Sequence, residues 1–599
     1  MCGIMGYIGE KPVQNILIQG LGHLEYRGYD SAGIAILDTT TKTIKVQKML
    51  GRVEKLKQTM KPVAGIMGMG HTRWATHGRP SDVNAHPHSD CKGDLALIHN
   101  GIIENYLDLK QDLLSKGHHF ASETDTEVIA HLIEEELKQQ ALKQQKTDLK
   151  TDLKKAVDTT LKKLIGTYAL CVLHKNYDYI VVARNGSPLV LGLGKGENFF
   201  GSDVTAFIAY TKNAVYLNDF ETAVVKKDSI QIFDKSGKPV KRNSTTINWD
   251  VEQAKKGGYE HFMLKEIFEQ PRVVRDTLQV KISDDVVKLC KSAKKLFVIA
   301  CGTASYAGLV GKYLIEQTAK IPVEWDAASE FRYKNPLIGR QDVLLVISQS
   351  GETADTLAAL RLAKEKGAKV IGIINVVDST IARESDQVIY TRAGPEIGVA
   401  STKAFSAQLA VLYRLAEKLS STGKNLKLDS LPALIEKVLK QNDAIAALAK
   451  KYFMVYNFFF IGRNVMYPIA LEGALKLKEI SYIHAEAYAA GELKHGPIAL
   501  VTDQVPTVAL VPKNALYSKM ISNIQEIKAR NGKIIAIATE GDQEIKEHCT
   551  DVISLPKTDE VLYPFLATIA VQLLAYHIAN LRECDIDKPR NLAKSVTVE

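Results

Sequence analysis

The sequence predicts an α/β protein with several domains, and three observations lead to that class. The chain has 599 residues, which at roughly 150 residues per domain allows about four domains, or three if one is large. Residues 1–240 contain short apolar segments separated by glycines, with a few helical patterns between them. Residues 286–430 and 450–590 repeat one alternation of strand and helix, which is typical of parallel sheets made of βαβ units.

Composition and charge exclude several classes of protein. Hydrophobic residues make up 46% and charged residues 24% of the chain, as in ordinary globular proteins. The net charge of +9 is small for this length and is not gathered in one block, so we expect no nucleic-acid partner. The lysine-rich run 143–163 alternates with other polar residues and indicates a solvated helix face. Residues 561–581 are long and apolar enough for a membrane span, but three polar residues and a proline within them favour a buried helix, and we expect no membrane partner.

The cysteines favour a reducing compartment. Seven cysteines are scattered along the chain, and none forms a C-x-x-C pair, so we predict neither a disulfide framework nor a zinc site. We also expect no other metal and no cofactor. The N-terminus shows no signal peptide, and the cytoplasm is therefore the predicted location.

Cys2 is the first candidate catalytic residue. A small residue after the initiator usually permits removal of Met1, and we expect Cys2 to become the mature N-terminus. The α-amine then titrates near pH ~8 and is partly neutral near pH 7, so it can take the proton of the thiol on the same residue. A nucleophile that carries its own base is also used by enzymes with an N-terminal threonine.

Three further segments supply what cleavage of a glutamine side chain needs. The side chain of Asn100 and the backbone N–H of Gly101 are suitable donors for an oxyanion hole. Arg73 offers a fork for a carboxylate, and Asp125 offers an anion for an ammonium group. Each also has a plain structural interpretation. Asn100-Gly101 is typical of a tight turn, Arg73 can form a surface ion pair, and Asp125 can be a helix N-cap.

Together these segments resemble the class II glutamine amidotransferase domain, in which the N-terminal residue is the nucleophile. The resemblance covers most of residues 1–240 and depends on five intact motifs: Cys-Gly-Ile, Tyr-Arg-Gly-Tyr-Asp-Ser-Ala-Gly, His-Thr-Arg-Trp-Ala-Thr-His-Gly, His-Asn-Gly and Ser-Glu-Thr-Asp-Thr-Glu. It implies a four-layered αββα sandwich of the Ntn hydrolase type. The implied roles are attack on the amide by Cys2, binding of glutamine by Arg73, Thr76, His77, Gly101 and Asp125, an oxyanion hole of Asn100 and Gly101, and gating of the ammonia route by Trp74.

Residues 241–285 are predicted to be a linker. Residues 241–258 are mostly polar, and a helical pattern then begins and runs to Ile267. Gln270-Pro271 follows, and the proline marks either the start of the next helix or a kink within it. The composition therefore indicates a domain junction here.

The first copy of the repeat contains a phosphate-binding signal. A buried strand, 343–347, runs into Ser348-Gln349-Ser350-Gly351-Glu352-Thr353, and a helix is predicted from about Ala354. Hydroxyls and backbone N–H groups at a helix N-terminus form a cradle for anions. The segment lacks the lysine of a nucleotide P-loop, and an ordinary capped helix start is the plain alternative. Cys301-Gly302-Thr303 ends the preceding strand at the same rim of the sheet, which favours binding.

The second copy lacks this cradle and contains reactive side chains instead. Lys476 and Glu479 are three residues apart and share one face of a predicted helix, although a surface ion pair has the same spacing. His495 lies in a predicted loop. The C-terminal segment 587–599 has no helical period, and its composition alone predicts a frayed terminus.

The two copies resemble the sugar isomerase (SIS) domain. The whole arrangement, a class II amidotransferase domain followed by two SIS domains, resembles the glutamine-dependent aminotransferases of fructose 6-phosphate. This second resemblance covers essentially the whole chain. The resemblance implies two doubly wound parallel sheets and a C-terminal tail that covers the sugar site. Residues implied to hold the sugar phosphate are Cys301, Gly302, Thr303, Ser348, Gln349, Ser350, Thr353 and Val399. Implied catalytic roles are ring opening by His495, a Schiff base by Lys594, proton transfer by Glu479 and oxyanion stabilisation by Lys476. The family often has serine after Cys-Gly-Thr, whereas this chain has Ala304 followed by Ser305. Either one hydroxyl contact to the phosphosugar is absent here, or Ser305 supplies it.

The resemblance implies transfer of the amide nitrogen of L-glutamine to D-fructose 6-phosphate, giving D-glucosamine 6-phosphate and L-glutamate, the first step of amino-sugar synthesis. It also implies a closed ammonia channel and a homodimer, with His495 acting in its own chain or in the partner. Two alternatives stay open: a different phosphosugar acceptor, and a non-catalytic phosphosugar sensor. Glutaminase activity discriminates between an enzyme and a sensor.

Overall fold

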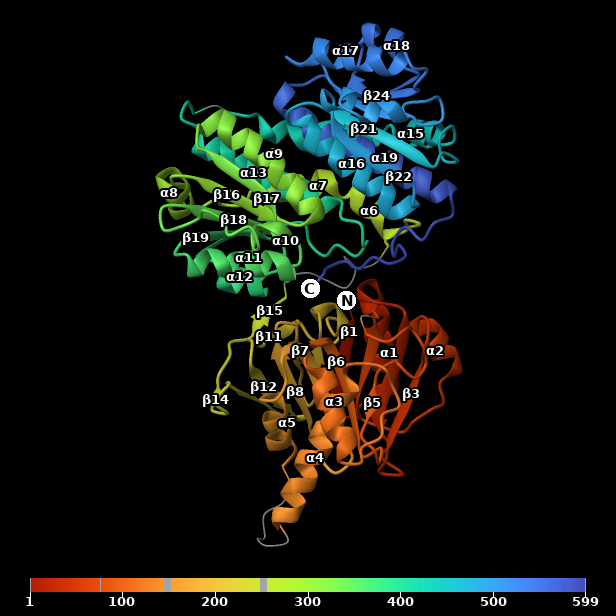
Figure 1. Cartoon of the computed structure of the whole chain (residues 1–599), viewed down its shortest axis with the longest axis vertical. Coiled ribbons are helices and arrows are strands. Elements are labelled where there is room, and N and C mark those ends of the chain that lie inside the picture. The colour runs from red at the N-terminus through yellow and green to blue at the C-terminus, as the bar shows by residue number, and fades with distance from the viewer. Residues whose placement is uncertain (1, 76, 145–151, 248–255, 424, 598–599) are drawn as a thin grey trace. The chain divides into compact units, whose positions relative to one another are not determined.

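The computed structural model describes residues 2–75, 77–144, 152–247, 256–423 and 425–597. The chain divides into two compact units (Figure 1). The first comprises residues 1–251 with 595–599, and the second comprises residues 252–594. Each unit is described by itself below.

The first unit contains two antiparallel sheets. Over its described residues, the larger sheet has the order β15 (Thr245–Thr246), β11 (Asn213–Tyr216), β9 (Val190–Leu193), β10 (Asn198–Gly201), β1 (Gly3–Ile8), β4 (Met67–Arg73), β2 (Ser31–Leu37) and β3 (Ile44–Leu50). The smaller has the order β14 (Pro239–Val240), β13 (Ile230–Phe233), β12 (Glu221–Val225), β8 (Ile180–Asn185), β7 (Gly166–His174), β6 (Leu95–Ile103) and β5 (His88–Ser89). The helices are α1 (Val13–Leu24), α2 (Val53–Thr59), α3 (Tyr106–Ser115), α4 (Glu127–Gln144) and α5 (Leu153–Leu161).

Three hydrophobic cores separate four layers in this unit. Alternate residues of a strand face opposite sides of its sheet, and in β1 Met5 packs against α1 whereas Ile4 packs into the core between the two sheets. In β7, Cys171 faces that same central core and Leu170 faces the core beneath α4. Figure 1 shows α3 and α4 beside β6 and β7. The layers are therefore helix, sheet, sheet and helix, which confirms the predicted αββα sandwich.

The second unit contains two parallel sheets with the same strand order. Within the described residues, the first runs β17 (Val323–Ala327), β16 (Leu296–Ala300), β18 (Val343–Ser348), β19 (Lys369–Ile374) and β20 (Gln387–Tyr390). The second runs β22 (His484–Ala489), β21 (Asn457–Gly462), β23 (Thr507–Val511), β24 (Ile534–Thr539) and β25 (Asp551–Leu555). In both sheets the strand that comes first in the chain lies second from one edge, the next strand in the chain forms that edge, and the other three follow in chain order on the opposite side. This shared topology confirms the predicted pair of doubly wound sheets.

Helices cover both faces of each parallel sheet. The hydrophobic residues of β16 alternate between two separate cores, Val298 facing one and Phe297 the other. The helices of the unit are α6 (Phe262–Phe268), α7 (Gln270–Leu278), α8 (Asp284–Ser292), α9 (Gly302–Ala319), α10 (Ala328–Phe331), α11 (Ala354–Glu365), α12 (Thr380–Glu384), α13 (Lys403–Leu419), α14 (Leu431–Leu439), α15 (Asn442–Ala449), α16 (Met466–Ser481), α17 (Tyr517–Lys528), α18 (Gln543–His548) and α19 (Tyr563–Leu581).

The apolar C-terminal helix is part of this core. Residues 560–581 are long and apolar enough to cross a membrane, but 89% of an apolar 18-residue window within them is buried inside the protein. Its polar residue Gln572 is fully buried and accepts a hydrogen bond from Gln270 of α7 at 2.8 Å. The prediction of a buried helix is therefore confirmed.

The linker and the tail meet within the second unit. Part of the predicted linker, residues 248–255, lies outside the described residues. Pro271 is in the first turn of α7, so it starts a helix rather than kinking one. The Asp587 carboxylate accepts the backbone N–H groups of Phe262 and Met263 at 2.9 and 3.0 Å and so caps α6. The composition-based prediction of a frayed tail is thus wrong at Asp587, because these charge-assisted bonds hold it.

Candidate active site

In the first unit, Cys2 lies where three predicted motifs converge. The backbone N–H of Trp74, just after β4, donates a hydrogen bond to Cys2 Sγ at 3.2 Å. Asn100 Nδ2, on β6, donates to the Cys2 carbonyl oxygen at 3.0 Å. The surrounding protein desolvates the thiol and raises its pKa, so the thiol needs a base to become a nucleophile.

A buried histidine orients the Asn100 amide. His71 Nε2 lies 2.9 Å from Asn100 Oδ1 and 3.1 Å from the carbonyl oxygen of His99. Burial lowers the pKa of His71 to about 3, so the ring is neutral at pH 7 and its Nε2–H donates to both acceptors. With Oδ1 occupied in this way, Asn100 Nδ2 is directed toward Cys2. The sequence analysis missed His71, although it opens the His-Thr-Arg-Trp motif.

Gly101 occupies a position that a side chain would not fit. Its φ is +137°, and a Cβ placed there would lie 2.1 Å from the carbonyl oxygen of Thr167 on β7. Nearby, Asp125 Oδ2 accepts the backbone N–H of Ile103 at 2.8 Å. Asp125 is therefore fixed to the end of the strand that carries Asn100 and Gly101, and it precedes α4 rather than capping it directly.

Arg73 keeps one donor unused. The side chain is only 3% exposed, and its Nη2 donates to the carbonyl oxygens of His77 and Gly78. Its Nη1 is buried without a hydrogen-bond partner among the described residues. A buried guanidinium nitrogen of this kind is suited to a carboxylate. Thr76, which was also predicted to bind glutamine, lies outside the described residues.

In the second unit, the loop after β18 has the form of a small cradle. Ser348 Oγ accepts the backbone N–H of Gly351 at 3.0 Å and lies 3.1 Å from Thr353 Oγ1. Ser350 Oγ accepts the N–H of Glu352 at 3.2 Å. Helix α11 begins directly after Thr353, as predicted, and its N-terminus adds a positive end of a helix dipole.

A second helix, α9, begins after β16, the strand next to β18. Gly302 begins α9 with a φ of +53°, and Cys301 Sγ lies 3.7 Å from Thr356 Oγ1 of α11. Thr303 is 9% exposed, and its Oγ1 accepts a hydrogen bond from Lys476 at 3.0 Å. The predicted sugar-phosphate residues of the first copy and a predicted catalytic residue of the second copy are therefore in direct contact.

Helix α16 carries a buried cluster of charges. Lys476 Nζ lies 2.6 Å from Glu479 and 3.5 Å from Glu472, and Lys476 and Glu472 are fully buried. Burial raises the pKa of Glu472 to about 8, whereas Glu479 is 20% exposed at its side chain. Burial acts to lower the pKa of Lys476, but the two carboxyl groups raise it more. The sequence analysis missed Glu472, although it is four residues before Lys476 on the same helix face.

Lys594 of the tail is held at a separate buried carboxylate. Its Nζ pairs with Glu396 and donates to the carbonyl oxygen of Gly398 at 2.8 Å. Glu396 Oε1 also accepts the backbone N–H of Thr402 at 2.9 Å. The backbone N–H of Val399, the residue after Gly398, donates a hydrogen bond to the carbonyl oxygen of Asp587 at 3.0 Å. The tail and the segment 396–399 are therefore bound to each other at two points.

His495 is not brought to the other predicted catalytic residues. It follows the short 3-10 helix Glu492–Lys494 and is exposed, and its side chain has no hydrogen-bond or ion-pair partner among the described residues. Leu500, a few residues later, is 62% exposed. Gln349 of the cradle is half-buried.

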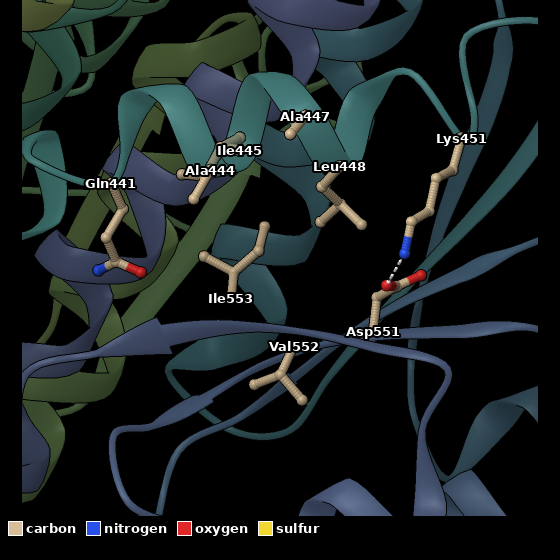
Figure 2. Close-up of a pocket in the computed structure, with 9 residues that line it drawn as sticks. All are labelled: Gln441, Ala444, Ile445, Ala447, Leu448, Lys451, Asp551, Val552 and Ile553. Carbon is tan, nitrogen blue, oxygen red and sulfur yellow. Dashed lines mark hydrogen bonds and ion pairs between the residues drawn. The ribbon is translucent and has the colours of Figure 1, made fainter.

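The second unit also has a pocket of about 260 Å³ between α15 and β25 (Figure 2). Apolar side chains such as Ile445, Leu448 and Ile553 line it, and Lys451 pairs with Asp551 at its edge at 2.5 Å. None of the predicted site residues lines this pocket.

Comparisons with known proteins agree with the two kinds of domain. The model of the glutamine amidotransferase domain matches residues 71–209, and that of the SIS domain matches residues 289–418 and 455–582. Three relatives named glutamine–fructose-6-phosphate aminotransferase [isomerizing] match over 100% of both chains: one from Thermus thermophilus at 50% identity, one from Methanosarcina acetivorans at 48% and one from Aquifex aeolicus at 47%. A solved structure of the C-terminal domain of glucosamine-fructose-6-phosphate aminotransferase from Francisella tularensis is 41% identical with a TM-score of 0.53, and covers 56% of this chain and 100% of that one.

Proposed function

Because the chain belongs to the family of glutamine–fructose-6-phosphate aminotransferases [isomerizing], we propose that it makes D-glucosamine 6-phosphate and L-glutamate from D-fructose 6-phosphate and L-glutamine. The observation that carries this proposal is the presence of two sites on one chain. One places a thiol beside an amide donor, and the other places a hydroxyl cradle beside a buried lysine and carboxylate. The first suits release of ammonia and the second suits its use on a phosphosugar.

The first site suits hydrolysis of the glutamine amide. With Met1 removed, the α-amine of Cys2 takes the thiol proton, and Sγ attacks the side-chain carbonyl carbon. The oxyanion receives hydrogen bonds from Asn100 Nδ2 and the N–H of Gly101. Ammonia leaves, and water hydrolyses the thioester to glutamate. We assign the unused Arg73 Nη1 to the substrate carboxylate, Asp125 to its ammonium group, and Trp74, which borders Sγ, to gating of the ammonia.

The second site suits amination and isomerisation of the sugar. The hydroxyls of Ser348, Ser350 and Thr353 hold the phosphate at the start of α11. Lys594 forms a C=N bond to C2 of the open-chain ketose with loss of water, and Glu396 is placed to accept the proton that the ammonium group must lose. Ammonia then adds to C2 and displaces the lysine nitrogen, which leaves an imine of ammonia at C2. Glu479 carries a proton from C1 to C2, which converts this imine into the amino aldehyde, while Lys476 stabilises the developing oxyanion.

We further propose a cytoplasmic homodimer in which His495 acts in the site of the partner chain. The exposure of His495 and of Leu500 in the single chain supports this assignment. All seven cysteines are free, which supports a reducing location.

A coupled product assay tests the reaction. The purified protein is given glutamine alone, fructose 6-phosphate alone, and both, and glutamate and glucosamine 6-phosphate are quantified. We expect equal yields of the two products when both substrates are present. Glutamate without the amino sugar would instead assign another phosphosugar as acceptor, and no glutamate under any condition would favour a sensor.

Complementation between two variants tests the assignment of His495. His495→Ala and Lys594→Arg chains are each expected to be inactive. If His495 acts in the partner's site, a mixed dimer contains one intact site, so co-refolding equal amounts is expected to restore about a quarter of the wild-type activity. Each variant refolded with itself is the matched control. Activity no higher than these controls would place His495 in the site of its own chain.

A further inference from the structure

Four metal-ligating side chains converge in the first unit, and none of them is a predicted glutamine-site residue. They are Cys91 in the turn between β5 and β6, His118 in the loop after α3, and His131 and Glu134 on α4. One donor atom from each lies within 4.8 Å of the other three. Both histidines and Glu134 are buried, and Cys91 closes the cluster from the exposed side.

The spacing of the donor atoms is that of a tetrahedral site. The two Nδ1 atoms of His118 and His131 are 3.3 Å apart, and Cys91 Sγ lies 3.5 and 3.4 Å from them. Glu134 Oε2 lies 3.2 and 3.4 Å from the same two nitrogens. A tetrahedral zinc ion, with Zn–N of about 2.05 Å and Zn–S of about 2.3 Å, separates its donors by about 3.3–3.6 Å.

The surrounding residues orient these donors as the outer partners of metal ligands do. Glu135 Oε2 lies 3.3 Å from His118 Nε2, the ring nitrogen that faces away from the cluster, and Glu127 lies 3.7 Å from His131 Nε2. The hydrogen bond with Glu135 fixes the tautomer of His118 in which Nδ1 carries a free lone pair, whereas Glu127 lies at ion-pair distance from His131. Lys138 pairs with Glu134 Oε1 at 2.8 Å, which leaves Oε2 for the cluster.

We propose that Cys91, His118, His131 and Glu134 bind one zinc ion as a closed structural site. Thiolate, imidazole and carboxylate donors in a tetrahedron favour Zn²⁺ over Mg²⁺ or Ca²⁺, which take oxygen ligands and higher coordination numbers. Four protein ligands leave no open position for a substrate. The sequence analysis predicted no zinc site because it considered closely spaced cysteine pairs, whereas these ligands are separated by 27, 13 and 3 residues.

The ion would connect three segments next to the glutamine site. Cys91 precedes β6, which carries Asn100 and Gly101, and His131 lies in the second turn of the helix that follows Asp125. Bound zinc would therefore fix the start of β6 against α4. This inference depends on the cluster itself and not on the proposed reaction.

Metal binding by the full-length protein tests the proposal. The protein is stripped with a chelator, dialysed, and titrated with Zn²⁺ against a chromophoric competitor, and with Co²⁺ followed by absorption. We expect about one ion per chain and, with Co²⁺, a thiolate charge-transfer band together with the intense visible bands of tetrahedral coordination. Zinc is also expected to raise the thermal unfolding temperature.

Two cysteine variants provide the comparison. Cys91→Ala, at an exposed turn, is expected to fold, to lose the charge-transfer band, to bind Zn²⁺ at least about 100-fold more weakly and to lose the stabilisation by zinc. Cys549→Ala, which removes a half-exposed thiol in the other unit, is expected to behave as the wild type. The proposal is overturned if the wild-type protein binds no Zn²⁺ at micromolar concentrations, or if Cys91→Ala retains the band.

Discussion

Replacing Cys2 with alanine is expected to lower the rate of glutamate release from glutamine by at least about 10⁴-fold, because it removes the thiol of the residue that Asn100 Nδ2 contacts. The wild-type protein and Cys2→Ala are compared by quantifying glutamate at saturating glutamine. The remaining donors stay in place, so a small residual rate above that in water is expected from them.

The matched control for this variant is Cys549→Ala, which removes a thiol of the other unit and should keep the wild-type rate. Fructose 6-phosphate binding, measured by calorimetry, is expected to be the same for Cys2→Ala and the wild type. If Cys2→Ala keeps a tenth or more of the glutaminase rate, another residue is the nucleophile.

Replacing Lys594 with arginine is expected to reduce glucosamine 6-phosphate formation by at least about 10³-fold. A guanidinium stays protonated at all working pH values and forms no Schiff base with a ketone, but it still pairs with the buried carboxylate of Glu396. Arginine is therefore preferred to alanine, which would leave that carboxylate buried without a cation. The product is quantified with glutamine and fructose 6-phosphate both saturating.

A second measurement separates chemistry from structure. Borohydride reduction in the presence of fructose 6-phosphate is expected to attach the sugar to Lys594 of the wild-type protein, as located by peptide mass spectrometry, and to give no adduct with Lys594→Arg. Lys588→Arg, a substitution in the same tail, should behave as the wild type. An adduct at a different lysine, or an active Lys594→Arg, would remove the Schiff-base assignment.

Much of the fold could be predicted because it depends on local patterns. The alternation of apolar strands and helices in residues 286–590 is a property of consecutive residues, and it correctly predicted two parallel sheets of equal topology. The start of α11 after Thr353 also follows from a local signal, whereas Pro271 left open a helix start or a kink, and the structure places it in the first turn of α7. The tail was mispredicted from composition because Asp587 is held by the N-terminus of α6, some 325 residues away in the chain.

The site could be predicted where one motif supplies the chemistry. Cys2, Asn100 and Lys476 were predicted as site residues because their residue types in those motifs match the steps of a known reaction class. His71 and Glu472 were missed because their importance comes from burial. The pKa of the histidine is lowered and the pKa of the carboxyl is raised only because the surrounding protein excludes water from both side chains.

The sequence by itself determined the class of each domain, the order of the domains and the residue types available for chemistry. Only the tertiary structure decided which of these side chains meet. It placed Lys476 of one sheet domain against Thr303 of the other, Lys594 against Glu396, and the four donors of the proposed zinc site around one point. The reason is that strand alternation and helix capping act over a few residues, whereas these contacts depend on how helices and strands distant in sequence pack around shared cores.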